Sequence, residues 1–241
     1  MMTRPAWQEL GRRLTEVLHL AVPPVAIAFG AEVPVDLPAF DAPMSEPALD
    51  GRRGRVPASC AFWIHGAERS FSTLPADHGN CSVGRYTHGL AKLEDVAGNE
   101  DVTALFESGW VRPEAVDTIP AVRTRPGAIS YGPLSELAPG MEPDVVLLRV
   151  NGRQLMVLSD ALPGLSIQGK PQCHIVALAE RGIPAASVGC ALSRARTGMR
   201  PEEMTCALPA AGLGEAVEAI EHSAAVDSEV AHYAASDARR F

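Results

Sequence analysis

The sequence predicts a single α/β (or α+β) domain with a mixed, partly parallel sheet flanked by helices. Its 241 residues are 46% hydrophobic and 21% charged, which is the composition of a globular protein with a substantial core. Residues 145–150, Val-Val-Leu-Leu-Arg-Val, are apolar on both faces, as expected of a central strand covered by helices on each side. Helical and strand patterns then alternate through the second half of the chain, which favours crossover helices.

The other elements follow from periodicity and from the residues that interrupt it. Leu10, Leu14 and Leu18 recur at helical spacing, and Pro23 and Pro24 end that first helix. Short apolar runs bounded by Gly or Pro are typical of buried strands. We therefore expect helices at residues 5–20, 101–110, 153–162, 172–181 and 215–235, and strands at residues 25–29, 127–131, 145–150, 185–188 and around 206.

Residues 34–57 show no period and are rich in Pro, Gly, Asp and Ala. We interpret them as a long surface loop of the kind that often covers a functional site. The loop ends in a basic patch that could receive an anionic ligand, although charged runs in loops are usually only solvated. The patch consists of Arg52, Arg53 and Arg55.

The whole chain, residues 1–241, reads as one domain, because neither a linker nor an internal repeat is visible. The net charge of −8 argues against a nucleic-acid partner, since affinity for phosphate backbones needs clustered Lys and Arg. We expect no membrane partner and a cytoplasmic location, because no long apolar segment and no secretory signal is recognisable. The helix at 215–235 is expected to dock on the core, and pairing with a second copy is the alternative.

Five cysteines make an odd number, in a chain too large to need disulfides for stability. Four of them, Cys60, Cys81, Cys173 and Cys190, occupy turn-like positions or the ends of elements, several beside glycines. From such positions a ligand can project toward a shared metal. The spacings include no CxxC pair, however, and free cysteines often only fill core volume, so spacing alone favours burial in the core over a metal site for these four. Cys206 lies in a strand pattern and is expected to be a core residue.

Several short motifs carry a resemblance to a known family. From about residue 10 to about residue 213, the chain resembles the domain of unknown function 169 (ArCR) family. The motifs occur in the same order as in that family and at approximately the same spacing. The motifs are Pro23-Pro24-Val25-Ala26, Cys60-Ala61-Phe62, Cys81 with Gly84 and Gly89, Pro143-Asp144-Val145-Val146, Gly169 with Cys173, and Gly189-Cys190-Ala191-Leu192-Ser193-Arg194. The resemblance implies that Cys60, Cys81, Cys173 and Cys190 act together.

Four cysteines dispersed in this way suit a 4Fe-4S cluster, whose ligands can come from separate loops. Structural zinc is the alternative cofactor, but zinc usually takes its cysteines in two close pairs. Histidines near Cys81 are weaker signals. His78 has a spacing that a metal could use, yet a hydrogen-bonded or surface histidine is the more common case, and His174 could at best support the neighbouring Cys173.

These features lead to three hypotheses of function. The first is an iron-sulfur enzyme, an oxidoreductase or lyase, in which Ser193 and Arg194 position a small-molecule substrate beside the cluster. The second is a non-catalytic electron carrier or redox sensor that meets a redox partner protein. The third is a zinc-binding protein or a metal-free cysteine enzyme, and the latter requires a histidine within hydrogen-bond reach of a reactive thiol. An enzyme should enclose a pocket next to the cluster, whereas a carrier should place the cluster near the surface.

Overall fold

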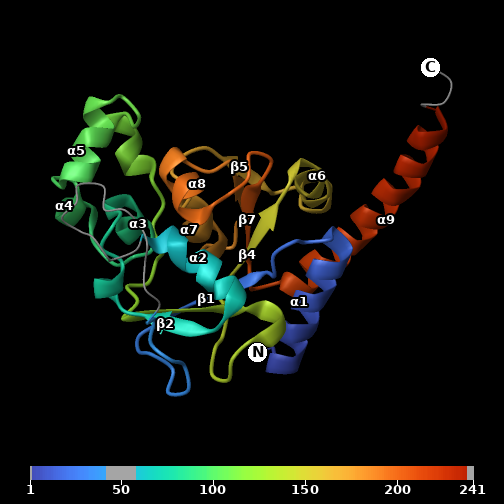
Figure 1. Ribbon diagram of the computed structural model, residues 1–241, viewed down its shortest axis with the longest axis horizontal. Helices are drawn as coiled ribbons and strands as arrows, with labels where there is room; N and C mark the ends of the chain where they lie inside the picture. Colours follow the sequence, from blue (N-terminus) through green and yellow to red (C-terminus); the bar gives the residue numbers. More distant parts are fainter. Residues whose placement is uncertain (1, 42–57, 238–241) are drawn as a thin grey trace.

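A computed structural model describes residues 2–41 and 58–237 of the chain. Its centre is a seven-stranded sheet in the order β2-β3-β1-β4-β7-β6-β5 (Figure 1). The pair β5 and β6 is parallel and the other neighbouring strands are antiparallel. The strands are β1 (Val25–Gly30), β2 (Phe71–Thr73), β3 (Ala128–Pro133), β4 (Val145–Val150), β5 (Ser166–Gln168), β6 (Ala185–Ser187) and β7 (Met204–Pro209).

The predicted mixed sheet is confirmed, and β4 is its central strand. Because successive side chains point to opposite faces of a strand, β4 contributes to two separate cores. Val146 and Leu148 belong to one core, and Val145 and Leu147 belong to the other. The sheet is therefore covered on both faces, as its apolar sequence indicates.

Three helices cover the first face: α1 (Arg4–Leu18), α6 (Gly152–Ala161) and α9 (Leu213–Asp237). Leu14 of α1 and the α9 residues Val217 and Ile220 are fully buried there. The first half of α9 thus docks on the core, whereas Figure 1 shows the second half projecting beyond the body of the protein. Within the described residues no helix has the length and apolar character needed to cross a membrane.

The second face is covered by α2 (Ser59–Glu68) and α7 (His174–Glu180), with α3 (Ser82–Thr87) and α8 (Ala191–Thr197) beside them. Helix α2 approaches the sheet closely at Gly66. A Cβ atom at this position would lie 2.8 Å from Val25 Cγ1 and 3.1 Å from Tyr131 Cβ. The absence of a side chain at Gly66 therefore sets the distance between α2 and the sheet.

Shorter helices form a layer at one end of the molecule, drawn in green in Figure 1. They are α4 (Leu93–Val96) and α5 (Glu100–Glu107). Three 3₁₀ helices complete the described elements: η1 (Pro75–Asp77), η2 (Pro113–Thr118) and η3 (Leu134–Glu136). Helix α5 forms one wall of the large pocket described below.

All the expected helices and strands are present, with small shifts of their ends. The alternation of helices and strands suggested more parallel pairing than the sheet contains, since among the strands of the described residues β5 and β6 form the one parallel pair. Helix α8, which the sequence does not predict, begins directly after Cys190. Most of the expected 34–57 loop, including Arg52, Arg53 and Arg55, lies outside the described residues.

Candidate metal centre

Four cysteines line one cavity of about 40 Å³ on the second face of the sheet. They are Cys60, Cys81, Cys173 and Cys190, the four that the sequence singled out. All four are free thiols, and Cys60 and Cys173 are buried while Cys81 and Cys190 are partly exposed. The fold thus gathers residues that lie up to 130 positions apart in the chain.

Each of these cysteines stands at the start of a different helix. Cys60 is the second residue of α2, and Cys81, Cys173 and Cys190 immediately precede α3, α7 and α8. The amide of Gly84 donates to Cys81 Sγ at 3.4 Å, and the amide of Ser193 donates to Cys190 Sγ at 3.3 Å. Backbone N–H groups at helix starts favour negative charge, so they stabilise thiolates over thiols.

Burial works in the opposite direction. Desolvation raises the pKa of the Cys60 thiol well above its usual range, and negative charge on Cys81 raises it further. Desolvation also raises the pKa values of Cys81 and Cys173. These three groups therefore stay protonated at neutral pH unless a positive centre binds and displaces the protons, which is the usual coupling between metal binding and thiol ionisation.

Arg196 supplies positive charge at the cavity. It is the cationic side chain among the described residues that line it, and its charge lowers the pKa values of Cys60 and Cys81 against the larger effect of burial. Its Nη2 donates to the backbone oxygen of Asn80 at 3.1 Å, next to Cys81. Arg196 therefore both orients the chain before Cys81 and offsets negative charge on the sulfurs.

A second, larger pocket of about 470 Å³ adjoins the cysteine cavity. The two share Cys81, Val83, Leu105, Trp110 and Leu192. The remaining lining residues come mainly from α5 and its C-cap: Glu100, Asp101 and Ala104 of the helix and Ser108 directly after it line the pocket. The volume and the largely apolar lining are those of a site for a small organic molecule. A molecule in this pocket would meet the cysteines on the side of Cys81.

The histidines near the cysteines have other partners. His78 is buried, with Nδ1 2.9 Å from Ser59 Oγ and Nε2 2.8 Å from Thr73 Oγ1. Nδ1 of His88 donates to the backbone oxygen of Gly84 at 2.8 Å. Both rings therefore stabilise the local fold. Across the described ranges, 2–41 and 58–237, no three or more His, Cys, Asp or Glu side chains are arranged to hold a single metal ion.

Ser193 lines the cysteine cavity, but its side chain serves the helix start. Its Oγ accepts a hydrogen bond from the Cys190 amide at 3.1 Å, while the Ser193 amide donates to Cys190 Sγ. This is a reciprocal cap of the kind that stabilises helix N-termini. Ser193 therefore orients Cys190. This contact is the most direct way in which Ser193 affects the site.

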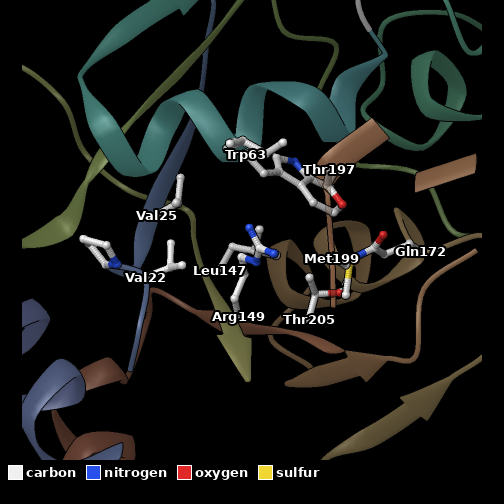
Figure 2. Close-up of a pocket in the computed structure, with 11 residues that line it drawn as sticks. Val22, Val25, Trp63, Leu147, Arg149, Gln172, Thr197, Met199 and Thr205 are labelled. Carbon is white, nitrogen blue, oxygen red and sulfur yellow. Dashed lines mark hydrogen bonds between the residues drawn. The ribbon is translucent and has the colours of Figure 1, made fainter. Parts of the chain in front are cut away.

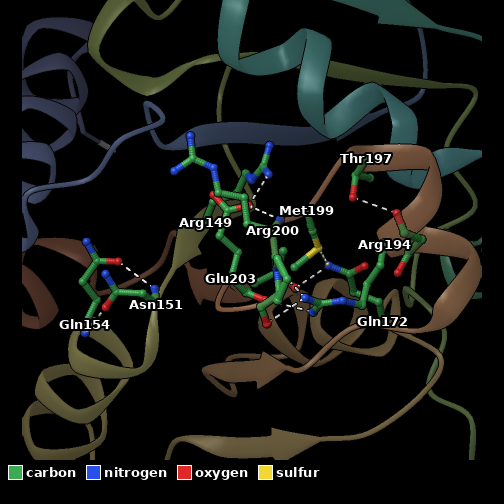
Figure 3. A network of polar contacts seen from close by, with 12 residues as sticks. Arg149, Asn151, Gln154, Gln172, Arg194, Thr197, Met199, Arg200 and Glu203 are labelled. Carbon is green, nitrogen blue, oxygen red and sulfur yellow. Dashed lines mark hydrogen bonds and ion pairs between the residues drawn. The ribbon is translucent and has the colours of Figure 1, made fainter.

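Arg194 points away from the cavity. Nη1 donates to the backbone oxygens of Val188 and Glu203 at 2.7 and 2.9 Å, and Nη2 donates to those of Arg200 and Pro201. Figure 3 shows this guanidinium within the network of the 199–203 turn. The expectation that Arg194 positions a substrate gains no support from these contacts, because its donors already hold the loop after α8.

Cys206 lies apart from the other cysteines. It is fully buried in β7 and belongs to the core on the opposite face of the sheet. Burial raises the pKa of its thiol to about 12. The expectation that Cys206 is a core residue is confirmed, and it offers a natural control for substitutions of the four cavity cysteines.

Comparison with known proteins places the chain in a family. The family described as DUF169, uncharacterised ArCR, matches residues 13–219. The chain belongs to the DUF169 family. The matched region contains all four cavity cysteines and the elements that carry them. No curated protein and no solved structure matches this DUF169 protein.

Sequence reasoning missed one feature of the site in this DUF169 protein, the pocket lined by α5. Its apolar lining is contributed by Leu105 and Trp110 in a segment recognised as a helix, but its position beside Cys81 depends on tertiary contacts.

Proposed function

We propose that this DUF169 protein binds a 4Fe-4S cluster through Cys60, Cys81, Cys173 and Cys190, and acts on a small molecule in the adjoining pocket. The observation that carries the proposal is the single cavity that all four thiols line, from the starts of four helices. Such a cluster would supply redox or Lewis-acid chemistry to a bound molecule.

The residues around the cavity fit a cluster. Thiolates are the usual ligands of iron-sulfur clusters, and hydrogen bonds to the sulfurs together with nearby charge tune their potentials. The amides of Gly84 and Ser193 donate such bonds to Cys81 and Cys190, and Arg196 brings a positive charge. The contributions of this chain are to hold the sulfurs, to compensate their charge and to exclude water from the buried side.

Zinc is the less suitable occupant. A structural zinc ion draws four ligands to one tetrahedral centre at about 2.3 Å from each sulfur. The described side chains contain no group arranged around one ion in this way. A multinuclear cluster spans a wider gap between its cysteines, because each cysteine binds a different iron atom.

The large pocket favours the enzyme hypothesis over an electron carrier. It adjoins the cysteine cavity, shares the Cys81 side chain with it, and has a volume of about 470 Å³ with a mainly apolar lining. The pocket supports a substrate with an apolar body that approaches the cluster from the side of Cys81. A carrier would need only a short path from the cluster to a partner protein.

A metal-free cysteine enzyme has less support. Such an enzyme needs a histidine that takes the proton of the thiol. Both ring nitrogens of His78 instead contact Ser59 and Thr73, and among the described residues no thiol lies within hydrogen-bond distance of Nε2 of His88. Burial also raises the pKa values of Cys60, Cys81 and Cys173, which makes each a poor nucleophile at neutral pH.

The test is iron and sulfide analysis with an absorption spectrum of protein purified without oxygen. We expect iron and sulfide in equal amounts. We also expect a broad absorption band at about 400 nm, which is typical of oxidised 4Fe-4S proteins. Cys60→Ser, Cys81→Ser, Cys173→Ser and Cys190→Ser should each lower the iron content. Cys206→Ser is the matched control and should retain it. Iron-free wild-type protein that contains zinc would overturn the cluster proposal.

A further inference from the structure

Two cavities of different size meet the cysteine cavity on this side of the sheet. The small one, drawn in Figure 2, shares Gln172 with it and has a volume of about 20 Å³, too small for an organic molecule. The large pocket shares Cys81 with it and has a volume of about 470 Å³. Asp101 of α5 belongs to the lining of this large pocket, and its contacts lead directly to Cys81.

Asp101 holds the start of α3 with both oxygens of its carboxylate. Oδ2 accepts a hydrogen bond from the amide of Ser82 at 2.9 Å, and Oδ1 accepts one from the Ser82 hydroxyl at 2.7 Å. Ser82 is the first residue of α3, directly after Cys81, and is 1% exposed. The first amides of a helix have no partner within the helix, so Asp101 supplies the acceptor that α3 itself lacks.

The residue that precedes α5 adds a third bond to this contact. Nδ2 of Asn99 donates to Ser82 Oγ at 2.7 Å, so the Ser82 hydroxyl both donates and accepts. From within α3, the amide of Gly84 donates to Cys81 Sγ. The start of α3 is therefore held from two sides, by a bond inside the helix and by the start of α5. Bonds to an ionised carboxylate are the stronger kind of hydrogen bond.

The charge of Asp101 also reaches the sulfur of Cys81. Burial is the main cause of the raised pKa of this thiol, and the negative charge of Asp101 raises the pKa further, whereas the Gly84 amide and the charge of Arg196 lower it. Asp101 and Arg196 thus act on Cys81 in opposite directions. The potential of an iron-sulfur cluster depends on nearby charge in the same way, because reduction adds negative charge to the cluster.

We propose that Asp101 is a positioning residue for Cys81, which it holds through Ser82, and that its negative charge lowers the reduction potential of the cluster. Asp101 also lines the large pocket, so one residue joins the wall of the proposed substrate pocket to a proposed cluster ligand. The effect on the potential rests on the proposed cluster, whereas the hold on Ser82 does not.

The hold on Ser82 is tested by amide hydrogen exchange of the full chain without metal. Asp101→Ala removes both acceptors, so the amides at the start of α3 should exchange about tenfold faster, the effect of losing a hydrogen bond to a charged group. Asp95→Ala is the matched control, because Asp95 accepts from the Lys92 amide at the start of α4 and lines neither the large pocket nor the cysteine cavity. Equal exchange at α3 in wild type and Asp101→Ala would overturn the hold.

The effect of charge has a separate readout, a redox titration of protein that holds iron. Asp101→Asn keeps the size of the side chain and removes its charge, so the midpoint potential should become more positive, while Asp95→Asn should leave it unchanged. A potential that stays the same or becomes more negative in Asp101→Asn would overturn the charge effect. Protein that binds no iron would overturn the cluster proposal instead, and hydrogen exchange would still decide the hold on Ser82.

Discussion

Cys190 and Ser193 cap the start of α8 reciprocally: the Ser193 amide donates to Cys190 Sγ at 3.3 Å, and the Cys190 amide donates to Ser193 Oγ at 3.1 Å. One pair of contacts therefore both begins the helix and directs the sulfur toward the cavity. Cys81 begins α3 in a related way through the amide of Gly84. The helix starts of this fold are thus also the positions from which the cavity thiols project.

Replacement of Ser193 tests whether its role is structural. Ser193→Ala removes the acceptor for the Cys190 amide, so the free energy of unfolding should fall by about 1 kcal/mol, the usual cost of losing a helix cap. Denaturant titration measures the change, and Ser228→Ala on the exposed part of α9 is the control. Unchanged stability would contradict the capping role and would restore Ser193 as a residue available to a substrate.

Arg196 should control the charge of the site. Arg196→Gln removes the positive charge that lowers the pKa values of Cys60 and Cys81, so alkylation of these thiols in metal-free protein should slow at a given pH. In protein with a cluster, the reduction potential should fall by about tens of millivolts, because the added electron loses a nearby positive charge.

Arg153→Gln is the matched control for this substitution. Arg153 pairs with Asp227 on the first face of the sheet, far from the cysteine cavity in the fold. It should change neither the alkylation rate nor the potential. Equal effects of the two substitutions would show that Arg196 acts only through the overall charge of the protein.

Gly66 should govern the position of α2 and hence of Cys60. Gly66→Ala places a Cβ atom 2.8 Å from Val25 Cγ1, so the helix must move away from the sheet. We expect a loss of about 1–3 kcal/mol in unfolding free energy, as for other overpacked sites, together with a lower iron content. Gly152→Ala is the control, because a Cβ atom there meets nothing within 4 Å. Full stability of Gly66→Ala would show that α2 is not held in this way.

Stability should fall in mild acid because of buried histidines. Desolvation lowers the pKa of His88 from 6.5 to about 4, so the unfolded chain takes up a proton at higher pH than the folded protein does. The free energy of unfolding therefore decreases as the pH falls from about 6.5 and levels off below about 4. Between pH 7 and pH 5 this histidine should account for about 2 kcal/mol.

His88→Gln should remove that share of the pH dependence, which denaturant titrations at pH 7 and pH 5 would measure. Part of the dependence should remain, because burial also lowers the pKa values of His78 and His174. His232→Gln, at an exposed position on α9, is the control. The same decrease in wild type and His88→Gln would contradict a neutral, buried His88.

The sequence predicts five of the seven described strands, because these carry their own apolar signal, and it misses the three-residue strands β2 and β5. Residues 145–150 are apolar on both faces, and they form the central strand between two cores. The start of α8 was not predicted, because its cap is the sulfur of Cys190, whereas Ser, Thr, Asp and Asn are the usual cap residues. Helix α2 was also missed, since its buried residues surround the helix without an amphipathic period.

The candidate site was predicted only in part, for a similar reason. The four cysteines were identified from their positions and from the family resemblance, and the fold brings them to one cavity. Arg194 lies four residues after Cys190 in sequence, but its side chain holds the 199–203 turn, while Arg196 reaches the cavity. Which of two neighbouring arginines faces a site depends on the phase of a helix whose start was not recognised.

The central claim is that Cys60, Cys81, Cys173 and Cys190 hold one cluster, and native mass spectrometry of protein purified without oxygen tests it most directly. We predict a single adduct with the mass of four iron and four sulfide ions, present in wild type and Cys206→Ser and lost in Cys173→Ser. A wild-type protein that carries one zinc ion, or no adduct before and after anaerobic reconstitution with iron and sulfide, would contradict the account.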